Sequence, residues 1–220
     1  MVATDRLGIE QAFHDRQAQQ RATTFARRPE ALHFEDAHYL DHETWIRPAF
    51  EQLGELQGLR VLDFGCGHGM AAVVLARRGA HVAAFDLSRG YLVEARNRAA
   101  ANGVRIDFAQ ADGERLPYGD GSFDRIWGHA VLHHLNVARA AAEVWRVLRP
   151  GGLAVFCEPW GENPLLSWVR RRVPYRGKER TPEEQPLGRR HLRILRQLFP
   201  TVEVHGYQLL SMARRVLPPG

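Results

Sequence analysis

From residue 60 onward, short apolar runs alternate with longer segments whose apolar residues recur at helical spacing. Short apolar runs bounded by glycine predict buried strands, and the longer periodic segments predict amphipathic helices. The expected strands span 60–65, 81–86, 104–112, the first part of 122–135 and 153–159, and the expected helices span 70–79, 88–103 and 137–152. Strands that alternate with helices predict a mostly parallel sheet with helices on both faces.

Local signals indicate where these helices begin and end. Ser88 is a suitable N-cap for the helix over 88–103, and Gly103 stands just past its end. Gly79 is a suitable stop for the preceding helix, and Pro150 with the following glycines ends the helix over 137–152.

The residues before this alternation are polar, with apolar residues at wide spacing, and we expect residues 1–58 to form a helical lid. A helix is predicted over 37–56 and should be broken or bent near Pro48, because the proline ring cannot continue the hydrogen-bond ladder. Tyr39 and His42 of this segment could close over a ligand, or their rings could pack the segment onto the core.

The residues after the alternation complete the expected domain, which spans 59–220. The segment 188–199 predicts a basic amphipathic helix, and 201–215 could supply a closing pair of strands. An insertion at about 159–190 is rich in proline and glycine, which argues against one regular element there. It follows the last predicted parallel strand.

Composition and charge narrow the classes of protein. The chain of 220 residues has a net charge of +5 and two cysteines, and it has no apolar run of the roughly 20 residues that a membrane helix needs. These features, with no apolar stretch after a basic start, favour one cytoplasmic domain without a disulfide framework. Oligomeric state is not predicted.

The basic excess is concentrated between Trp168 and Arg196. These side chains could bind a carboxylate or phosphate on a small-molecule acceptor, RNA or an anionic membrane surface, or they could form a solvated face. No aromatic-interleaved RNA-binding motif accompanies them, so nucleic acid is the less favoured partner.

The first chemical motif is VLDFGCGHGM, residues 61–70. Gly65, Gly67 and Gly69 fall at a strand-to-helix turn, where glycine lets the backbone approach a ligand and the helix N-terminus presents free N–H groups. Asp63 would be costly to bury without a partner. It could shape the glycine loop, orient the amino-acid end of a ligand, or do both. A tight turn without a ligand is the alternative.

Two further acidic residues end predicted strands. Asp86 stands about 20 residues after Gly65, where a carboxylate can accept hydrogen bonds from both ribose hydroxyls. Its alternative role, an N-cap, is better filled by Ser88. Asp112 ends the third strand, where it could bind an adenine amino group or stabilise a loop before Gly113. Ligands of parallel sheets bind beyond such strand ends.

These motifs, together with VLRPGG, resemble in order the class I S-adenosylmethionine-dependent methyltransferases, especially small-molecule enzymes of the methyltransferase domain 11 type, over roughly residues 40–160. The resemblance implies a Rossmann-like three-layer α/β sandwich with a seven-stranded sheet whose last strand is antiparallel. It implies S-adenosyl-L-methionine as cofactor and S-adenosyl-L-homocysteine as product. The cofactor-binding residues that we expect are Tyr39, Asp63, Gly65, Cys66, Gly67, Gly69, Asp86, Leu87, Asp112, Gly113 and His129.

The sulfonium is itself the electrophile, so we expect no metal. His129, after the fourth strand, is the preferred general base, because histidine titrates near neutrality; capping or cofactor positioning is its alternative. His133 and Glu158 are further catalytic candidates, although His133 and His134 could equally pack or hold a loop and Glu158 could pair with an arginine. His129 and His133 could share a helix face, but no nearby carboxylate motif completes a metal site.

We therefore expect methyl transfer to an oxygen, nitrogen or carbon nucleophile of a small metabolite. The chain lacks an N-P-P-Y motif after the fourth strand and an evident magnesium-binding carboxylate set, and both absences favour a small-molecule acceptor. The alternatives are an RNA methyltransferase, a dinucleotide-dependent dehydrogenase, and a non-catalytic module that keeps the cofactor site. The identity of the acceptor and of the methylated atom is not predicted.

Overall fold

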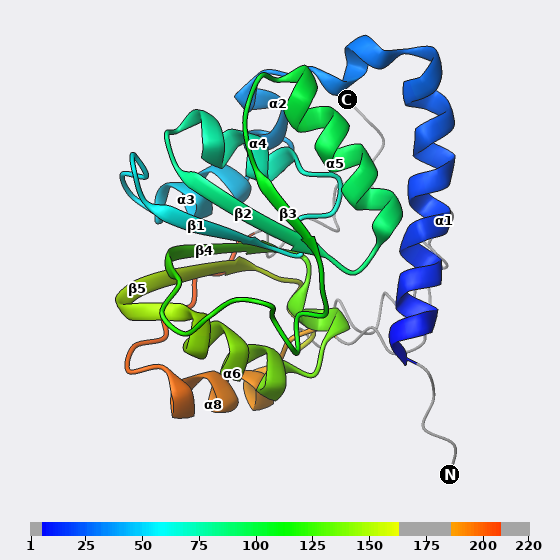
Figure 1. Cartoon of the computed structure of the whole chain (residues 1–220). Helices are drawn as coiled ribbons and strands as arrows, with labels where there is room; N and C mark the ends of the chain where they lie inside the picture. The colour runs from blue at the N-terminus through cyan, green and yellow to red at the C-terminus, as the bar shows by residue number, and fades with distance from the viewer. Residues whose placement is uncertain (1–5, 163–185, 208–220) are drawn as a thin grey trace, which may run out of the picture.

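A computed structural model describes residues 6–162 and 186–207 of the chain. At its centre, five parallel strands form one sheet in the order β3-β2-β1-β4-β5 (Figure 1). The strands are β1 (Arg60–Phe64), β2 (His81–Asp86), β3 (Asp107–Gln110), β4 (Phe123–His129) and β5 (Leu148–Cys157). The predicted parallel sheet is confirmed. Strands β1, β2 and β3 extend to one side, and β4 and β5 are added on the other, so the strand order switches between β1 and β4.

Helices cover both faces of this sheet (Figure 1). One face carries α2 (Asp36–Leu40), α3 (Ile46–Glu51), α4 (Met70–Arg77) and α5 (Arg89–Ala101), and the other carries α6 (Val137–Val147) and α8 (Arg189–Leu198). Successive residues of β1 serve the two cores: Val61 packs in the cluster with α3 and α4, whereas Leu62 packs in the cluster with α6. A strand buried on both faces reads as a continuous apolar run, which is the pattern seen before Gly65.

The predicted helix boundaries rest on capping that the structure shows. The Ser88 hydroxyl accepts a hydrogen bond from the Tyr91 N–H at 3.1 Å, as expected of an N-cap. Gly79 and Gly103 follow α4 and α5 with φ of +83° and +67°, a conformation that costs glycine little. The basic helix expected over 188–199 is confirmed as α8, which packs against α6.

Helix α1 (Arg6–Arg27) lies along α5 (Figure 1). Ion pairs and hydrogen bonds hold it there: Glu94 of α5 accepts from Arg21 and from Arg98, each at 2.7 Å. Asp15 accepts from the Ser88 hydroxyl at 2.5 Å and from the Gly90 N–H at 3.0 Å. The N-terminal region is therefore helical, as predicted, and α1 is fixed at several points along its length.

The helix expected over 37–56 is broken, which is one of the two forms predicted, but the break lies before Pro48 and not at it. Two short helices, α2 and α3, occupy this segment, and the break between them precedes Pro48. Pro48 is the third residue of α3. In the first turn of a helix the missing N–H costs nothing, since it would have no partner within the helix.

The fifth strand begins earlier than predicted. Helix α6 ends at Val147, and β5 starts at Leu148, so that Pro150 falls inside the strand. The register between β4 and β5 shifts between Phe123 and Arg125. Because β5 is the last strand in this sheet order, its outer edge tolerates a residue that cannot donate a hydrogen bond.

The predicted closing strands and the insertion are only partly covered. Residues 201–207 contain no strand, and 208–215 lie outside the described residues. Most of the insertion, 163–185, also lies outside them. The described part of the sheet has five strands, so a count of seven with an antiparallel last strand stays a prediction. No described helix combines the length and apolar character needed to cross a bilayer.

Candidate active site

A cavity of about 340 Å³ opens beyond the carboxyl ends of β1, β2 and β4. This volume lies within the range of small-molecule sites. Helix α1 supplies part of the wall, and strand ends, the loops after them and Tyr91 of α5 supply the rest. The lining residues are Arg6, Leu7, Glu10, His14, Gly65, Gly67, His68, Phe85, Asp86, Leu87, Tyr91, Ala111, Asp112, Gly113, His129, Ala130, Val131, His134 and Leu135.

The glycine loop after β1 forms the floor of the cavity, and its three glycines have different constraints. Each has a positive φ, of +71° at Gly65, +50° at Gly67 and +81° at Gly69. A Cβ at Gly65 would overlap Val131, and one at Gly69 would stand 2.7 Å from the Ala95 Cβ. At Gly67 a Cβ would meet no atom within 4 Å. Gly65 and Gly67 line the cavity and Gly69 does not, so Gly69 serves helix packing.

Asp86 connects the end of β2 to the glycine loop. Its carboxylate accepts a hydrogen bond from the Gly67 N–H at 2.7 Å and another from the Ser88 N–H at 2.8 Å. Burial raises the pKa of this carboxyl, and the two backbone donors act in the opposite direction. Asp86 lies in the cavity wall, as predicted, with each oxygen already fixed by one donor.

Asp63 lies deeper than the residues that line the cavity and is 2% exposed. Burial raises the pKa of its carboxyl to about 8, although the Ala72 N–H donates a hydrogen bond to it. Its Oδ2 atom has no hydrogen-bond partner among the residues that the structure describes. Asp63 therefore holds the N-terminus of α4 through one oxygen and keeps the other available as an acceptor.

The predicted adenine-side residues also reach the cavity. Leu87, Asp112 and Gly113 all line it. Asp112 accepts a hydrogen bond from the Glu114 N–H at 2.9 Å, which is the loop-stabilising role considered as its alternative. A Cβ at Gly113 would stand 2.8 Å from Leu135, so the loop packs closely at this point.

His129 is the last residue of β4 and lines the cavity. Burial lowers the pKa of its imidazole, so the ring is largely neutral at pH 7. The next residue, Ala130, has φ of +56°. Its N–H donates to the Cys157 carbonyl at 2.8 Å, which holds this unfavourable conformation in place. Strained backbone thus turns the chain across the cavity immediately after His129.

His133 and Glu158 form a buried pair outside the cavity lining. The Nδ1 atom of His133 lies 2.7 Å from Glu158 Oε2, and each side chain is 6% exposed. Glu158 Oε1 also accepts from the N–H groups of Val131 and Leu132 at 2.9 and 2.8 Å. These contacts fix the turn η2 (Leu132–His134), and the arginine partner considered for Glu158 is replaced here by backbone donors and an imidazole. A catalytic role for either residue stays a prediction.

Tyr39 and Cys66, two more of the predicted cofactor-binding residues, also lie outside the cavity lining. Tyr39 is 8% exposed and packs in the core, where its hydroxyl accepts from the Trp127 indole N–H at 3.0 Å. Burial raises its pKa well above the usual range. The Cys66 side chain is buried, and its N–H donates to the Phe85 carbonyl at 2.8 Å. His129 and His133 do not share a helix face, since one ends β4 and the other lies in η2.

Sequence reasoning missed the contribution of α1 to the cavity. Arg6, Glu10 and His14 all line it, and Arg6 donates to the His134 carbonyl at 2.8 Å and pairs with Glu114. The spacing of Glu10 and His14, four residues apart on one helix face, was the signal available. Nothing local, however, indicates what that face contacts.

Comparison with known proteins identifies the domain. Residues 62–156 match a family model described as a methyltransferase domain. The chain is 44% identical over 114 residues to methyltransferase GfsG of Streptomyces halstedii, covering 50% of this chain and 41% of that protein. It is 37% identical over 130 residues to a demethylmenaquinone methyltransferase of Clavibacter sepedonicus, covering 59% and 52%. The chain therefore spans about half the length of these curated relatives.

Solved structures agree with this assignment. An S-adenosylmethionine-dependent methyltransferase from Mesorhizobium loti superposes with a TM-score of 0.50 at 35% identity, covering 55% of this chain and 56% of that one. The [4+2]-cyclase SpnF superposes with a TM-score of 0.56 at 28% identity, covering 69% and 54%. The predicted resemblance to the class I S-adenosylmethionine-dependent methyltransferases is confirmed over the matched domain: the parallel sheet, the glycine loop and these matches show a methyltransferase domain at residues 62–156 with a Rossmann-like α/β fold.

Proposed function

We propose that this chain binds S-adenosylmethionine in the cavity beyond β1, β2 and β4 and transfers its methyl group to an oxygen, nitrogen or carbon nucleophile of a small molecule. One observation carries the proposal. Asp86 lies in the cavity wall and is tied to the Gly67 N–H at 2.7 Å, so the acidic strand end and the glycine loop form one surface.

The residues present suit this cofactor. The Asp63 Oδ2 atom, buried and without a partner in the described part of the chain, can accept a hydrogen bond from the cofactor's ammonium group or a water bound to it. The open space beside Gly67 lets a ligand approach the backbone. Asp86 keeps further lone pairs for the ribose hydroxyls, and Leu87 and Asp112 are available to the adenine.

When bound, the cofactor supplies a methyl group on a positively charged sulfur. The chain then has to hold the acceptor in line and keep water out, and positioning of this kind contributes roughly 7–11 kcal/mol to barrier lowering. We assign α1 the role of the lid, because Arg6, Leu7, Glu10 and His14 form one wall of the cavity. Tyr39 packs in the core, with its ring centroid 6.3 Å from that of His129, and we do not assign it a contact with the cofactor.

We assign proton removal to His129. Burial lowers the pKa of its imidazole, so a ring nitrogen is free to accept a proton at neutral pH. The strained backbone at Ala130 fixes the end of β4 and therefore the position of the His129 side chain. Glu158 and His133 hold the following turn, and a role in positioning suits their contacts better than proton transfer.

A small-molecule acceptor is supported by the relatives. The Clavibacter protein is named for demethylmenaquinone, and another relative, 31% identical over 141 residues, is named as a ubiquinone biosynthesis O-methyltransferase of Dinoroseobacter shibae. Both names describe small-molecule methylation, although neither identifies the acceptor of this chain. An acidic group on the acceptor stays a prediction, because no residue of the basic helix α8 lines the cavity.

The first test is calorimetric titration of the purified protein with S-adenosylhomocysteine and, separately, with NADH and NADPH. We expect binding of the first alone, and Asp86→Ala should abolish it. Binding of a nicotinamide cofactor alone would overturn the proposal. Turnover is then measured by screening acceptors with labelled S-adenosylmethionine, where His129→Ala should lower kcat and leave affinity for S-adenosylhomocysteine within about twofold of the wild type.

A second function is favoured by one observation. The structural relative SpnF is described as a [4+2]-cyclase, so this fold also serves a reaction that is not methyl transfer. In that case S-adenosylhomocysteine would bind as strongly, but no acceptor would gain label. The labelled-methyl assay therefore separates the two functions, whereas the binding measurement does not.

A further inference from the structure

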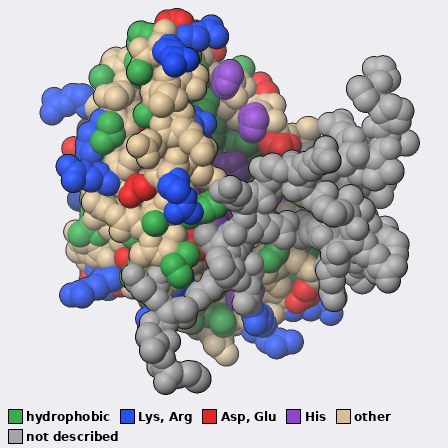
Figure 2. Space-filling view, turned by 90° about the vertical axis from the view of Figure 1, so that its right-hand side faces the viewer, with side chains coloured by type: hydrophobic (Ala, Val, Ile, Leu, Met, Phe, Trp, Pro, Cys, Tyr) green, Lys and Arg blue, Asp and Glu red, His purple; other side chains and the backbone are tan. Residues whose placement is uncertain are grey.

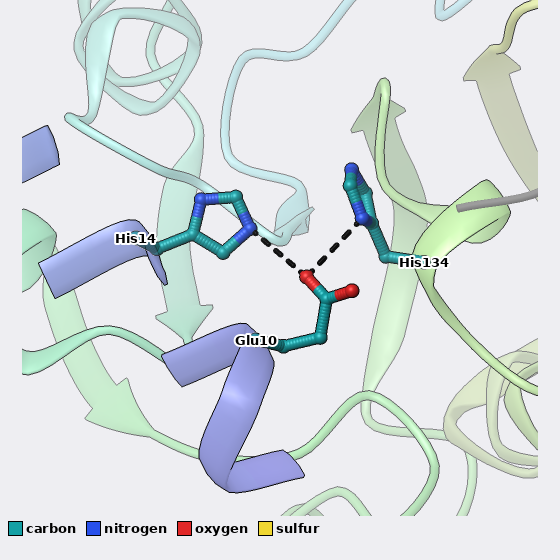
Figure 3. Close-up of side chains that lie close together, drawn as sticks. All are labelled: Glu10, His14 and His134. Carbon is teal, nitrogen blue, oxygen red and sulfur yellow. Dashed lines mark ion pairs between the residues drawn. The ribbon is translucent and has the colours of Figure 1, made fainter. Parts of the chain in front are cut away.

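Three potential metal ligands meet at the end of the cavity lined by α1. Glu10 and His14 belong to α1, and His134 belongs to η2, more than a hundred residues away in the chain. Their ligand atoms all lie within 4.8 Å of one another. Figure 3 shows both imidazoles directed at the same carboxylate oxygen of Glu10. In the space-filling view, several histidine side chains are visible on the face that carries α1 (Figure 2).

The distances between these atoms suit ligands of a shared ion. Glu10 Oε2 lies 3.5 Å from His14 Nε2 and 3.3 Å from His134 Nδ1. Two ligands on a tetrahedral ion, each bound at roughly 2.0–2.1 Å, are separated by about 3.3 Å. Charge-assisted hydrogen bonds are shorter, at about 2.7–2.9 Å. Both distances to Glu10 Oε2 therefore match the spacing of two ligands on one ion. The ligand nitrogens of His14 and His134 lie within 4.8 Å of each other, and rotation of one imidazole would bring them to the same spacing.

The ligands come from segments that are held in place. Glu10 and His14 are four residues apart, so they share one face of α1, and Asp15 next to them fixes the helix to the start of α5 at Ser88. His134 is held on its other side, where its carbonyl accepts from Arg6 at 2.8 Å. A site built between two supported segments keeps its geometry without the ion.

The chemistry of the donor set selects the class of ion. Two imidazoles and one carboxylate form the three-residue set of many zinc sites, which leave a fourth position open. Imidazole nitrogen favours zinc and neighbouring transition metals over magnesium and calcium. The Glu10 side chain is 6% exposed, and a cation bound to it would offset the cost of burying that carboxylate beside two imidazoles.

We propose that Glu10, His14 and His134 bind one divalent transition-metal ion, for which Zn²⁺ is the best fit, and that this ion ties α1 to the turn after β4. Its fourth position faces the cavity, where a water or an oxygen atom of a small molecule can bind. Bridging these segments closes one end of the cavity, because α1 forms that wall. The site differs from the His129 and His133 pair weighed from the sequence, since its carboxylate comes from α1.

The test uses tag-free protein treated with a chelator and titrated with Zn²⁺ against a chromophoric competitor, and with Co²⁺ followed by visible absorption. The wild type should bind one ion per chain and show the intense absorption bands of tetrahedral Co²⁺. His134→Ala and Glu10→Gln should each weaken Zn²⁺ binding at least tenfold. The matched control is His205→Ala, because His205 forms an exposed pair with Glu203 at the same 3.5 Å.

Two further readouts keep the result interpretable. Circular dichroism establishes that each variant is folded, and His14→Ala replaces any variant that is not. Zn²⁺ should raise the Tm of the wild type and of His205→Ala, and should leave that of His134→Ala unchanged. Absence of stoichiometric binding, or equal binding by all variants, would overturn the proposal and leave the three side chains as an ion-paired cluster. Because S-adenosylhomocysteine binding is not a readout, failure here leaves the proposed methyl transfer untouched.

Discussion

Replacement of Asp63 by asparagine should change how the stability of the apo-protein depends on pH. The side chain is buried, the Ala72 N–H donates to it, and its Oδ2 atom has no partner within the described ranges, so burial raises its pKa to about 8. In the unfolded chain an aspartate has a pKa of about 3.9. Between these two values the folded state binds one more proton than the unfolded state. The stability contribution of the protonated group is complete below pH 4 and is lost as the pH rises toward 8.

The magnitude follows from linkage. One proton corresponds to about 1.4 kcal/mol per pH unit, so the wild type should lose about 2.7 kcal/mol of unfolding free energy between pH 5.0 and 7.0 from this group alone. Asp63→Asn has no such proton to lose. His68, whose pKa burial lowers to about 4, changes stability in the opposite direction, but it does so equally in both proteins. The difference between variant and wild type therefore isolates Asp63.

The assay is urea unfolding of both proteins, monitored by circular dichroism at half-unit steps from pH 5.0 to 7.0. We expect the free energy of unfolding of Asp63→Asn minus that of the wild type to increase by about 2.7 kcal/mol over this range. A constant difference would mean that Asp63 is ionised in the folded protein, and the reasoning from burial would be refuted. Saturating S-adenosylhomocysteine should reduce the increase, since an ammonium group beside Asp63 favours the carboxylate.

Two structural predictions test the packing around the site. Gly69→Ala should lower the free energy of unfolding by about 2–5 kcal/mol, because φ of +81° is unfavourable for alanine and the new Cβ would stand 2.7 Å from that of Ala95. The control, Gly103→Ala, has φ of +67° but open space around the new Cβ, so it should cost only about 1–2 kcal/mol. Equal losses of the two variants in urea unfolding would contradict this account. Glu158→Ala should lower the free energy of unfolding by about 2–4 kcal/mol, because it leaves the Val131 and Leu132 N–H groups without their acceptor. Glu158→Gln should recover at least half of that loss. A loss below about 1 kcal/mol for Glu158→Ala would show that water replaces the carboxylate.

Most of the sheet could be predicted because its signals are local. The run before Gly65 and the caps at Ser88 and Gly103 lie within the elements that they define. The start of β5 was misplaced for the opposite reason. Pro150 and the following glycines are typical of a helix end and a loop, but β5 pairs with β4 at Leu148 and again from Leu153, so they fall inside one strand. Such pairing is a property of two segments.

The residues of the candidate site also divide into those that local signals indicate and those that depend on contacts between distant segments. Asp86 ends β2 and Asp112 follows β3 by two residues, and both could be placed at the cavity because position in a parallel sheet follows from chain order. The burial of Tyr39 could not be predicted locally, because its ring packs in the core and its hydroxyl accepts from Trp127, far along the chain. The contribution of Glu10 could not be found locally, because the salt bridge from Arg21 to Glu94 helps to determine which side of α1 meets the cavity.

In the strand order β3-β2-β1-β4-β5, one half of the cavity is built from β1, β2 and β3 and the other half from β4 and β5. The glycine loop, Asp86 and Asp112 follow β1, β2 and β3, whereas His129 and the turn held by Glu158 follow β4 and depend on β5. The halves join along the pairing of β1 with β4. Substitutions on the β4 side can therefore reshape the space for the proposed acceptor, while Asp86 and Asp112, the proposed ribose and adenine partners, keep their positions. One scaffold can in this way be reassigned to new acceptors without rebuilding the part that recognises its cosubstrate.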